Sequence, residues 1–139
     1  MLMAMETALI STLAALVAAT GAITMYAAVT AAPFARTPRA AVRAARQLAG
    51  RAPGELLVDL GCGHGQVLTI AAREFGARAT GYELAPHHAL VAWVAANIRG
   101  RGRASVRWKN LFDADLSRAD VIYFWLTPHA FPRLLPKLA

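Results

Sequence analysis

The stretch VDLGCGHG, from Val58 to Gly65, determines how this chain folds. It begins within the apolar run Leu56–Leu60, which predicts a buried strand, and it precedes Gln66–Phe75, whose apolar spacing predicts a helix. Glycines at alternate positions let a turn bend sharply and let a ligand approach the main chain. The N-terminus of the following helix adds free N–H groups and a positive dipole end. This turn therefore suits a nucleotide-like or carboxylate-bearing ligand.

The remainder of the chain alternates predicted strands with predicted helices. Further strands are predicted at Ala79–Glu83, Ser105–Lys109 and Val121–Leu126, and helices at Pro38–Gly50, His87–Ile98 and Pro128–Leu138. The side chains expected to pack the helix at His87–Ile98 against the sheet are Leu90, Val91, Val94 and Ile98. Alternation at this spacing is typical of βαβ units. We therefore predict an α/β fold with a Rossmann-like parallel sheet, ordered 3-2-1-4 and covered by helices on both faces.

The N-terminal segment differs in composition from the rest. No residue from Thr7 to Ala35 is charged, and this run exceeds the ~20 residues that a helix needs to cross a bilayer. Apolar residues fall on all sides, which argues against a surface amphipathic helix. Met1–Glu6 carries an acid and no basic side chain, which argues against a cleaved signal peptide. We predict that residues 1–35 span a membrane once and that residues 36–139 form the ligand-binding domain.

Basic residues follow the predicted span. Arginines stand at positions 36, 39, 43, 46 and 51, and the first acid after them is Glu55. The positive-inside bias then predicts a domain on the cytoplasmic side. A second basic run, from Arg99 to Lys109, contains Trp108. It indicates either a nucleic-acid contact or a solvated loop, and we favour the solvated loop.

The spacing of the glycine turn distinguishes two classes of nucleotide ligand. Dinucleotide folds use G-x-G-x-x-G to admit a pyrophosphate, whereas this chain has G-x-G-x-G. Asp59, two residues before the first glycine, would repel a pyrophosphate and attract the ammonium of a methionine moiety. Glu83, at the end of the second predicted strand, would accept both ribose hydroxyls. These acids favour S-adenosylmethionine over a nicotinamide cofactor.

Cysteine and histidine usage limits other chemistries. The chain has one cysteine, Cys62, which excludes a disulfide framework within the chain. The four histidines are scattered in sequence, and we predict no metal site. Asn110 follows the third predicted strand, where its amide would reach the adenine edge and Leu111 or Phe112 would cover the adenine face.

Taken together, these stretches resemble the class I methyltransferases. More narrowly, the chain is similar to small membrane-anchored relatives of the ATP synthase c-subunit lysine methyltransferases and to archaeal protein lysine methyltransferases. The stretches that carry the resemblance are Pro33–Pro38, Val58–Gly65, Gly81–Pro86, Asn110–Ser117 and Asp120–Pro128. The resemblance implies an N-terminal span, a cytosolic-side domain and transfer of a methyl group from S-adenosylmethionine to protein lysine.

The resemblance also implies a set of site residues. Phe34 and Thr37 would close over the cofactor, and Trp125 and Thr127 would border the methyl acceptor. The predicted cofactor site consists of Phe34, Thr37, Asp59, Gly61, Cys62, Gly63, Gly65, Glu83, Leu84, Asn110 and Leu111. Relatives often carry an acid and then an arginine where this chain has His64 and Gln66, so what braces the loop is left open.

One alternative function remains at this point. The chain ends shortly after the fourth predicted strand, whereas a class I methyltransferase continues with a fifth. The fold would then be a truncated form of that class. The alternative is therefore a catalytically inactive Rossmann-like membrane protein that binds the cofactor or a partner without turnover. Nucleic acid is disfavoured as an acceptor, because the place after the fourth strand lacks the Asn/Asp-Pro-Pro-aromatic signature of nucleobase methyltransferases.

Overall fold

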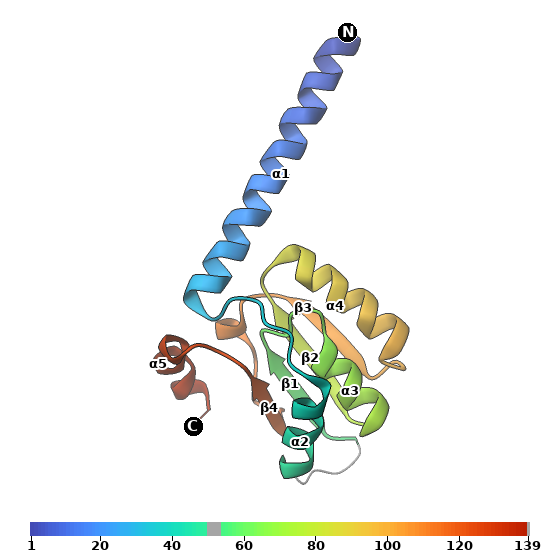
Figure 1. Cartoon of the computed structure of the whole chain (residues 1–139), viewed down its shortest axis with the longest axis vertical. Coiled ribbons are helices and arrows are strands. Elements are labelled where there is room, and N and C mark those ends of the chain that lie inside the picture. The colour runs from blue at the N-terminus through green and yellow to red at the C-terminus, as the bar shows by residue number, and fades with distance from the viewer. Residues whose placement is uncertain (50–53, 139) are drawn as a thin grey trace.

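A parallel four-stranded sheet forms the centre of the domain, and one long helix extends away from it (Figure 1). The computed structural model describes residues 1–49 and 54–138, so the predicted helix end at Gly50 and the basic residue Arg51 lie outside the described residues. The strands are β1 (Leu56–Leu60), β2 (Arg78–Glu83), β3 (Ala104–Trp108) and β4 (Val121–Phe124). Their order is β3-β2-β1-β4, with every neighbouring pair parallel. The predicted α/β fold and strand order are confirmed.

Helices cover the two faces of the sheet unequally. The longer helices are α1 (Leu2–Thr30), α2 (Arg39–Ala49), α3 (Gln66–Glu74) and α4 (Pro86–Arg99). Residues of α2, α3 and α4 pack with Leu57 and Ala79 in one buried cluster. Val58 and Leu60 face the other way and pack with Leu134 in a second cluster. The central strand β1 is thus covered on both faces, as expected for a parallel sheet.

The face through which α4 packs differs from the prediction. Ala89, Ala92 and Ala96 are its buried residues. The large side chains expected to face the core are exposed instead: Leu90, Val91, Val94 and Ile98 are 62%, 45%, 41% and 75% exposed. The close approach of α4 to the glycine loop admits only small side chains, because a Cβ on Gly65 would lie 3.3 Å from the Cα of Ala92.

The C-terminal segment is broken into short turns rather than one helix. It comprises η2 (Pro128–Ala130), α5 (Phe131–Leu134) and η3 (Leu135–Lys137), where η denotes a 3₁₀ helix. Proline recurs at positions 128, 132 and 136. A proline inside a helix removes a backbone donor and clashes with the preceding turn. The predicted helix Pro128–Leu138 is therefore wrong as a continuous element.

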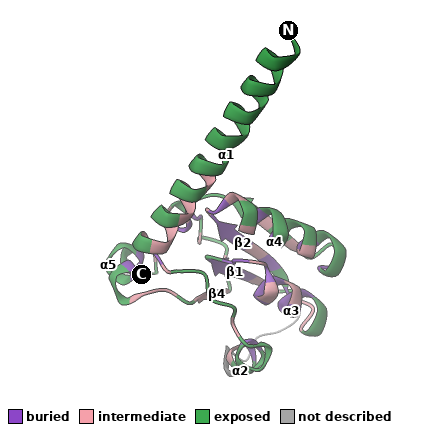
Figure 2. Ribbon diagram, turned by 45° about the horizontal axis from the view of Figure 1, so that its top comes forward, coloured by how far each residue is buried: buried purple, intermediate pink, exposed green. Residues whose placement is uncertain are grey.

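The N-terminal helix α1 is long and apolar enough to cross a membrane. Every residue from Met1 to Ala19 is exposed, and partial burial begins at Thr20, where the helix reaches the domain (Figure 2). The hydroxyls of Ser11 and Thr12 donate to the carbonyls of Thr7 and Ala8, each over 2.8 Å. These polar side chains are satisfied within the helix and do not oppose burial in lipid.

Candidate functional site

The glycine turn wraps over the end of β2. The backbone N–H groups of Gly61 and Cys62 both donate to the carbonyl of Tyr82, over 2.9 and 3.0 Å. Gly63 and Gly65 have φ angles of 53° and 73°, in the left-handed region that favours glycine. The loop thereby places its main chain at the carboxyl edge of the sheet, where α/β folds bind ligands.

Glu83 joins this loop to the start of α4. Its Oε2 accepts a hydrogen bond from the N–H of Gly63, and its Oε1 accepts one from the N–H of Ala85, each over 2.9 Å. Burial raises the pKa of this carboxyl, and the hydrogen bonds from the Ala85 and Gly63 N–H groups oppose that rise. Each carboxylate oxygen has two lone pairs, so Glu83 keeps the capacity to accept from a ligand.

Asp59 is the most deeply buried acid of the site. It is 3% exposed, and none of the described residues donates a hydrogen bond to its carboxylate. Burial, with a smaller contribution from the charge of Glu83, raises the pKa of Asp59 to about 8. An unpartnered buried carboxylate is costly unless a donor or a cation reaches it. Asp59 therefore marks a position where a cationic group of a ligand would be stabilised.

A pocket at this edge collects most of the predicted site residues. The predicted residues that line it are Phe34, Thr37, Asp59, Gly61, Cys62, Gly63, Glu83, Leu84, Asn110, Leu111 and Trp125. Gly65 and Thr127 lie outside the lining. Gly65 instead allows α3 to pack closely on α4, as its contact with Ala92 shows. Thr127 donates from its N–H and its hydroxyl to the carbonyl of Ala31, over 2.9 and 2.6 Å, and so connects α1 to the segment after β4.

The residues after β3 divide between the pocket and the opposite side. Asn110 uses its Oδ1 to accept from the N–H of Phe112 over 3.1 Å, which leaves its amide N–H₂ group available as a donor. Leu111 is buried and lines the pocket. Phe112 does not line it, because its ring is covered by the guanidinium of Arg133 at 3.8 Å from the centroid. Leu111, rather than Phe112, is placed to cover a ligand ring.

Cys62 has a packing role in this arrangement. Its side chain lies over Gly81, where an added Cβ would meet the sulfur at 2.6 Å. Burial, together with the charges of Asp59 and Glu83, raises the pKa of the Cys62 thiol well above its usual value. The thiol therefore stays protonated, which excludes a thiolate nucleophile at neutral pH.

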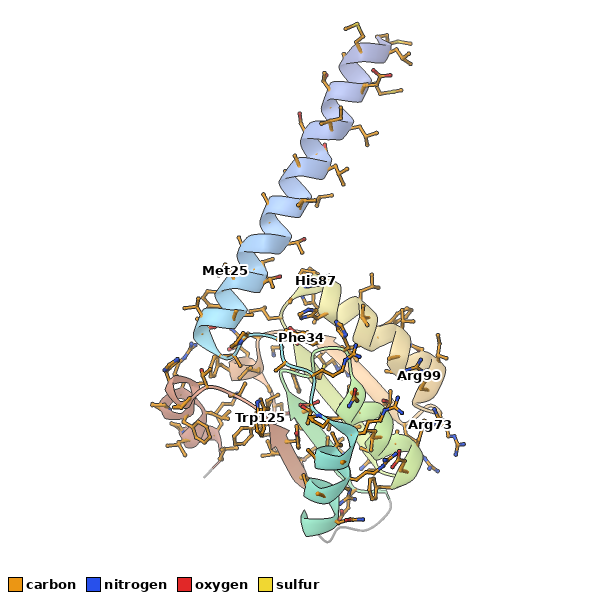
Figure 3. The ribbon with its side chains drawn as sticks, viewed as in Figure 1. Met25, Phe34, Arg73, His87, Arg99 and Trp125 are labelled. Carbon is orange, nitrogen blue, oxygen red and sulfur yellow. The ribbon has the colours of Figure 1, made fainter. Side chains whose placement is uncertain are left out.

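Three of the histidines, although scattered in sequence, form one cluster with Phe34 in the fold. The Phe34 ring lies 4.5 Å from that of His64 and 4.3 Å from that of His88, and His87 lies 4.1 Å from His88. Burial, with nearby His87 and His64, lowers the pKa of His88 to about 4, so this imidazole is neutral at pH 7. Figure 3 shows Phe34 and His87 on the side of the domain that faces α1. Sequence spacing did not reveal this cluster, because its members come from three separate elements.

The bracing of the loop, which the sequence left open, involves Gln66. Its side-chain amide donates to the carbonyl of Thr37, which ties the segment before α2 to the start of α3. This contact holds Thr37 beside the pocket.

The end of α1 is a part of the site that the sequence did not predict. Thr24, Ala27, Ala28 and Ala31 line the pocket together with residues of the sheet edge. Arg36 follows, and among the described residues that line the pocket it carries the one permanent positive charge. No periodicity in the sequence shows that a membrane-type helix also forms the wall of a ligand site.

Comparisons with known proteins agree with this geometry. A protein-lysine N-methyltransferase from Saccharolobus islandicus (strain REY15A) is 33% identical over 101 residues, which cover 70% of this chain and 62% of that relative. This chain thus spans less than two thirds of the length of that relative. An RNA methyltransferase from Salinibacter ruber, solved in complex with S-adenosyl-L-homocysteine, has 33% identity and a TM-score of 0.72 over 75% of this chain and 69% of its own.

A more distant structure shares the same fold. It is a geranyl diphosphate C-methyltransferase from Streptomyces coelicolor A3(2), with 28% identity and a TM-score of 0.55 over 61% of this chain and 33% of its own. The profile of the ANTKMT methyltransferase domain matches residues 59–139, a range that begins at the buried acid and contains Glu83 and Asn110. Since this match covers more than half of the chain and most of the site just described, the chain belongs to the family of ANTKMT methyltransferase domains.

Proposed function

We propose that this chain binds S-adenosylmethionine at the sheet edge and transfers its methyl group to a lysine side chain of a protein. The observation that carries the proposal is the buried Asp59 carboxylate, which has no donor among the described residues and lies in one pocket with Glu83. Two acids at the base of a pocket favour a ligand with an ammonium group and hydroxyl donors. The named activities of the similar proteins support the same class of reaction.

Different residues of the pocket would hold different parts of the cofactor. Asp59 receives the ammonium of the methionine moiety, and Arg36 is the cation available for its carboxylate. Glu83 accepts from the ribose hydroxyls with the lone pairs that its backbone contacts leave free. Asn110 and Leu111 contact the adenine.

The acceptor side lies at the end of β4. When bound, S-adenosylmethionine would supply an electrophilic methyl group on its sulfonium, and transfer of this group to a neutral amine would break the sulfur–methyl bond and release S-adenosylhomocysteine. Tyr123 pairs in register with Asp59 on the neighbouring strand, and Trp125 lines the same pocket while 72% exposed. An incoming lysine that enters the pocket past Trp125 would be partly desolvated, which lowers the pKa of its ammonium and favours the neutral amine, and the proton would be released to solvent. We assign no general base.

The anchoring of the chain belongs to the same proposal. The single span lies in α1, within the predicted membrane segment 1–35, although the end of that segment, from Thr24, also lines the cofactor pocket, and residues 36–139 form the rest of the methyltransferase domain. Arg36, Arg39 and Arg43 follow the span, which favours a cytoplasmic domain. Protease added outside oriented membrane vesicles distinguishes the two orientations, because the domain is protected only when it lies inside them.

Calorimetric titration of S-adenosylmethionine into the full-length chain in detergent tests the cofactor assignment. Asp59→Asn is expected to lower the affinity roughly 10- to 100-fold, since it removes a charge-assisted contact in a buried site. Asp113→Asn is the matched control, because Asp113 is exposed and outside the pocket. Equal affinity of wild type and Asp59→Asn would contradict the assignment.

Transfer of a labelled methyl group into a membrane extract tests the acceptor. We expect the label to resist nuclease, to be released by protease, and to appear as methyl-lysine after hydrolysis. If nuclease removes the label, the acceptor is a nucleic acid. RNA is the acceptor class named for the similar methyltransferase from Salinibacter ruber. Cofactor binding with no transfer to any macromolecule would support the inactive alternative.

A further inference from the structure

The outer face of α4 is unusually apolar for a face that no part of the described chain covers. Leu90 is 62% exposed, Trp93 55% and Ile98 75%, while the opposite face packs on the sheet through alanines alone. Val91 and Val94 extend the same stripe, at 45% and 41% exposure. A contiguous apolar stripe of this kind marks an interaction surface.

The stripe lies on the side of the domain from which α1 leaves. In both Figure 1 and Figure 2, α4 begins close to the lower part of α1 and runs away from it across the domain, and the two helices are in contact. His87 precedes Leu90 by one helical turn and so shares its face, and Figure 3 shows it on the side toward α1. The start of the outer face of α4, at His87, therefore lies on the side of the domain that α1 enters.

The free length of α1 places a bilayer surface at the level of α4. At 1.5 Å per residue, the fully exposed part of the helix, Leu2–Ala19, is about 27 Å long. The hydrocarbon core of a bilayer is ~30 Å thick. The helix first meets the domain at Thr20. A bilayer that covers the free part of α1 thus ends where the domain and α4 begin.

The charges around α4 complement an anionic membrane surface. Between Glu83 and Asp113 the sequence contains no acidic residue, and it contains the basic residues Arg99, Arg101, Arg103, Arg107 and Lys109. All of these basic residues are exposed. Trp93 is 55% exposed and Trp108 is 66% exposed. Tryptophan is enriched at the interface between a membrane and water. Basic residues near such a surface attract anionic head groups.

From these observations we propose that the outer face of α4 is a second membrane contact, inserted in the head-group region of the bilayer that α1 crosses. The inference rests on the proposed membrane span of α1. A second copy of the chain is the less favourable occupant, because it would bring two basic surfaces into one interface, with no acidic residue between Glu83 and Asp113 to pair with them. The contact fixes the domain at two points and holds the cofactor pocket, whose wall includes the end of α1, at the lipid surface.

Depth-dependent quenching in vesicles tests the proposal with the full-length chain. Single cysteines are introduced by Val94→Cys on α4, Leu13→Cys on α1 and Arg73→Cys on α3, and each is labelled with an environment-sensitive fluorophore. Arg73 is an exposed control on a helix whose end points away from α1 (Figure 3). The native Cys62 is buried, so wild-type chain should take up no label. The vesicles contain phosphatidylcholine and phosphatidylglycerol, with or without brominated acyl chains.

We expect brominated lipid to reduce emission at position 94 by about twofold or more and to leave position 73 nearly unchanged. Equal quenching at positions 94 and 73 overturns the proposal. If the label at 94 is then also shielded from aqueous iodide, a second copy of the chain covers the face instead. Position 13 reports separately on the anchor. Quenching at position 13 but not at position 94 refutes the α4 contact alone. Quenching at position 94 but not at position 13 refutes the span on which the inference rests.

Discussion

The backbone N–H of Gly63 donates a hydrogen bond to Oε2 of Glu83 over 2.9 Å, which ties the glycine loop to the end of β2. Oε1 of the same carboxylate accepts from the N–H of Ala85, at the start of α4. One side chain thus fixes the geometry of two successive βα connections and still faces the pocket. Positioning of the loop and recognition of the ligand are therefore linked in one carboxylate.

Glu83→Gln should weaken both roles. The amide keeps one acceptor oxygen, but its N–H₂ group would face a backbone N–H donor. Hydrogen bonds to a charged group contribute about 1.5–3 kcal/mol, so we expect S-adenosylmethionine affinity to fall roughly 10- to 100-fold and the melting temperature to fall as well. Calorimetry and thermal melts measure the two effects. Glu74→Gln, which removes a surface pair with Arg43, is the control and should leave affinity unchanged.

Cofactor binding should release a proton near neutral pH. In the unliganded chain the pKa of Asp59 is raised to about 8, so its carboxyl is mostly protonated at pH 7. An ammonium group favours the ionised carboxylate and lowers this pKa in the complex. Affinity should therefore increase as the pH rises from 6 to about 8. Titrations in two buffers of different ionisation enthalpy count the protons. Asp59→Asn should bind weakly at every pH, and a pH-independent wild-type affinity would contradict this assignment.

Because the pKa of Asp59 is raised in the fold, the free energy of unfolding should depend on pH. The pKa of this carboxyl is raised from 3.8 to about 8 in the fold, so its protonated form stabilises the native state. That contribution is complete below the unfolded pKa and is lost as the pH rises through about 8. Without cofactor, Asp59→Asn should therefore melt several degrees above wild type at pH 8 to 9, with a smaller difference at pH 5. A difference that is constant with pH would rule out this origin.

The fold and the loop were predictable because their signals are local. Strand, glycine turn and helix follow one another within Leu56–Glu74, and Asp59 and Glu83 lie at or next to the carboxyl ends of adjacent parallel strands. The face of α4 that packs against the sheet could not be predicted from such local signals. Both of its faces are apolar, and the preference for alanines on the inner face comes from a tertiary contact, the close approach of Ala92 to Gly65.

Other parts of the site depend on contacts that are distant in sequence. The ring cluster joins Phe34 with His64 and His88, from three separate elements. Ala31 meets Thr127 across a separation of 96 positions. A periodic pattern reports on the residues of one element and carries no information about such pairs. For the same reason, the sequence could indicate a membrane helix in α1 but not its place in the pocket wall.

Gly63→Ala should destabilise the fold through Phe34. An added Cβ would lie 2.8 Å from Cε2 of Phe34, at a φ angle of 53°. Left-handed backbone at a residue other than glycine costs about 1–3 kcal/mol, and the clash adds to this cost. In the background Phe34→Ala, the same glycine substitution should cost less, because the clash is gone. Thermal melts of the four proteins form a double-mutant cycle. Strictly additive effects would show that the two residues do not interact.

Thr127→Val should affect catalysis more than cofactor binding. The Thr127 hydroxyl and N–H both donate to the carbonyl of Ala31, and Ala31 lines the pocket at the end of α1. Valine keeps the shape and the backbone contact but loses one hydrogen bond, a change of about 1 kcal/mol. Because Thr127 does not line the pocket, we expect an unchanged Kd for S-adenosylmethionine. Methyl transfer to protein should slow by roughly 3- to 10-fold, since Ala31 and Trp125 line the same pocket and a shift of the end of α1 would change the acceptor side. Thr127→Ser retains the hydroxyl and should restore the rate. A serine variant as slow as the valine variant would assign the effect to packing of the methyl group instead.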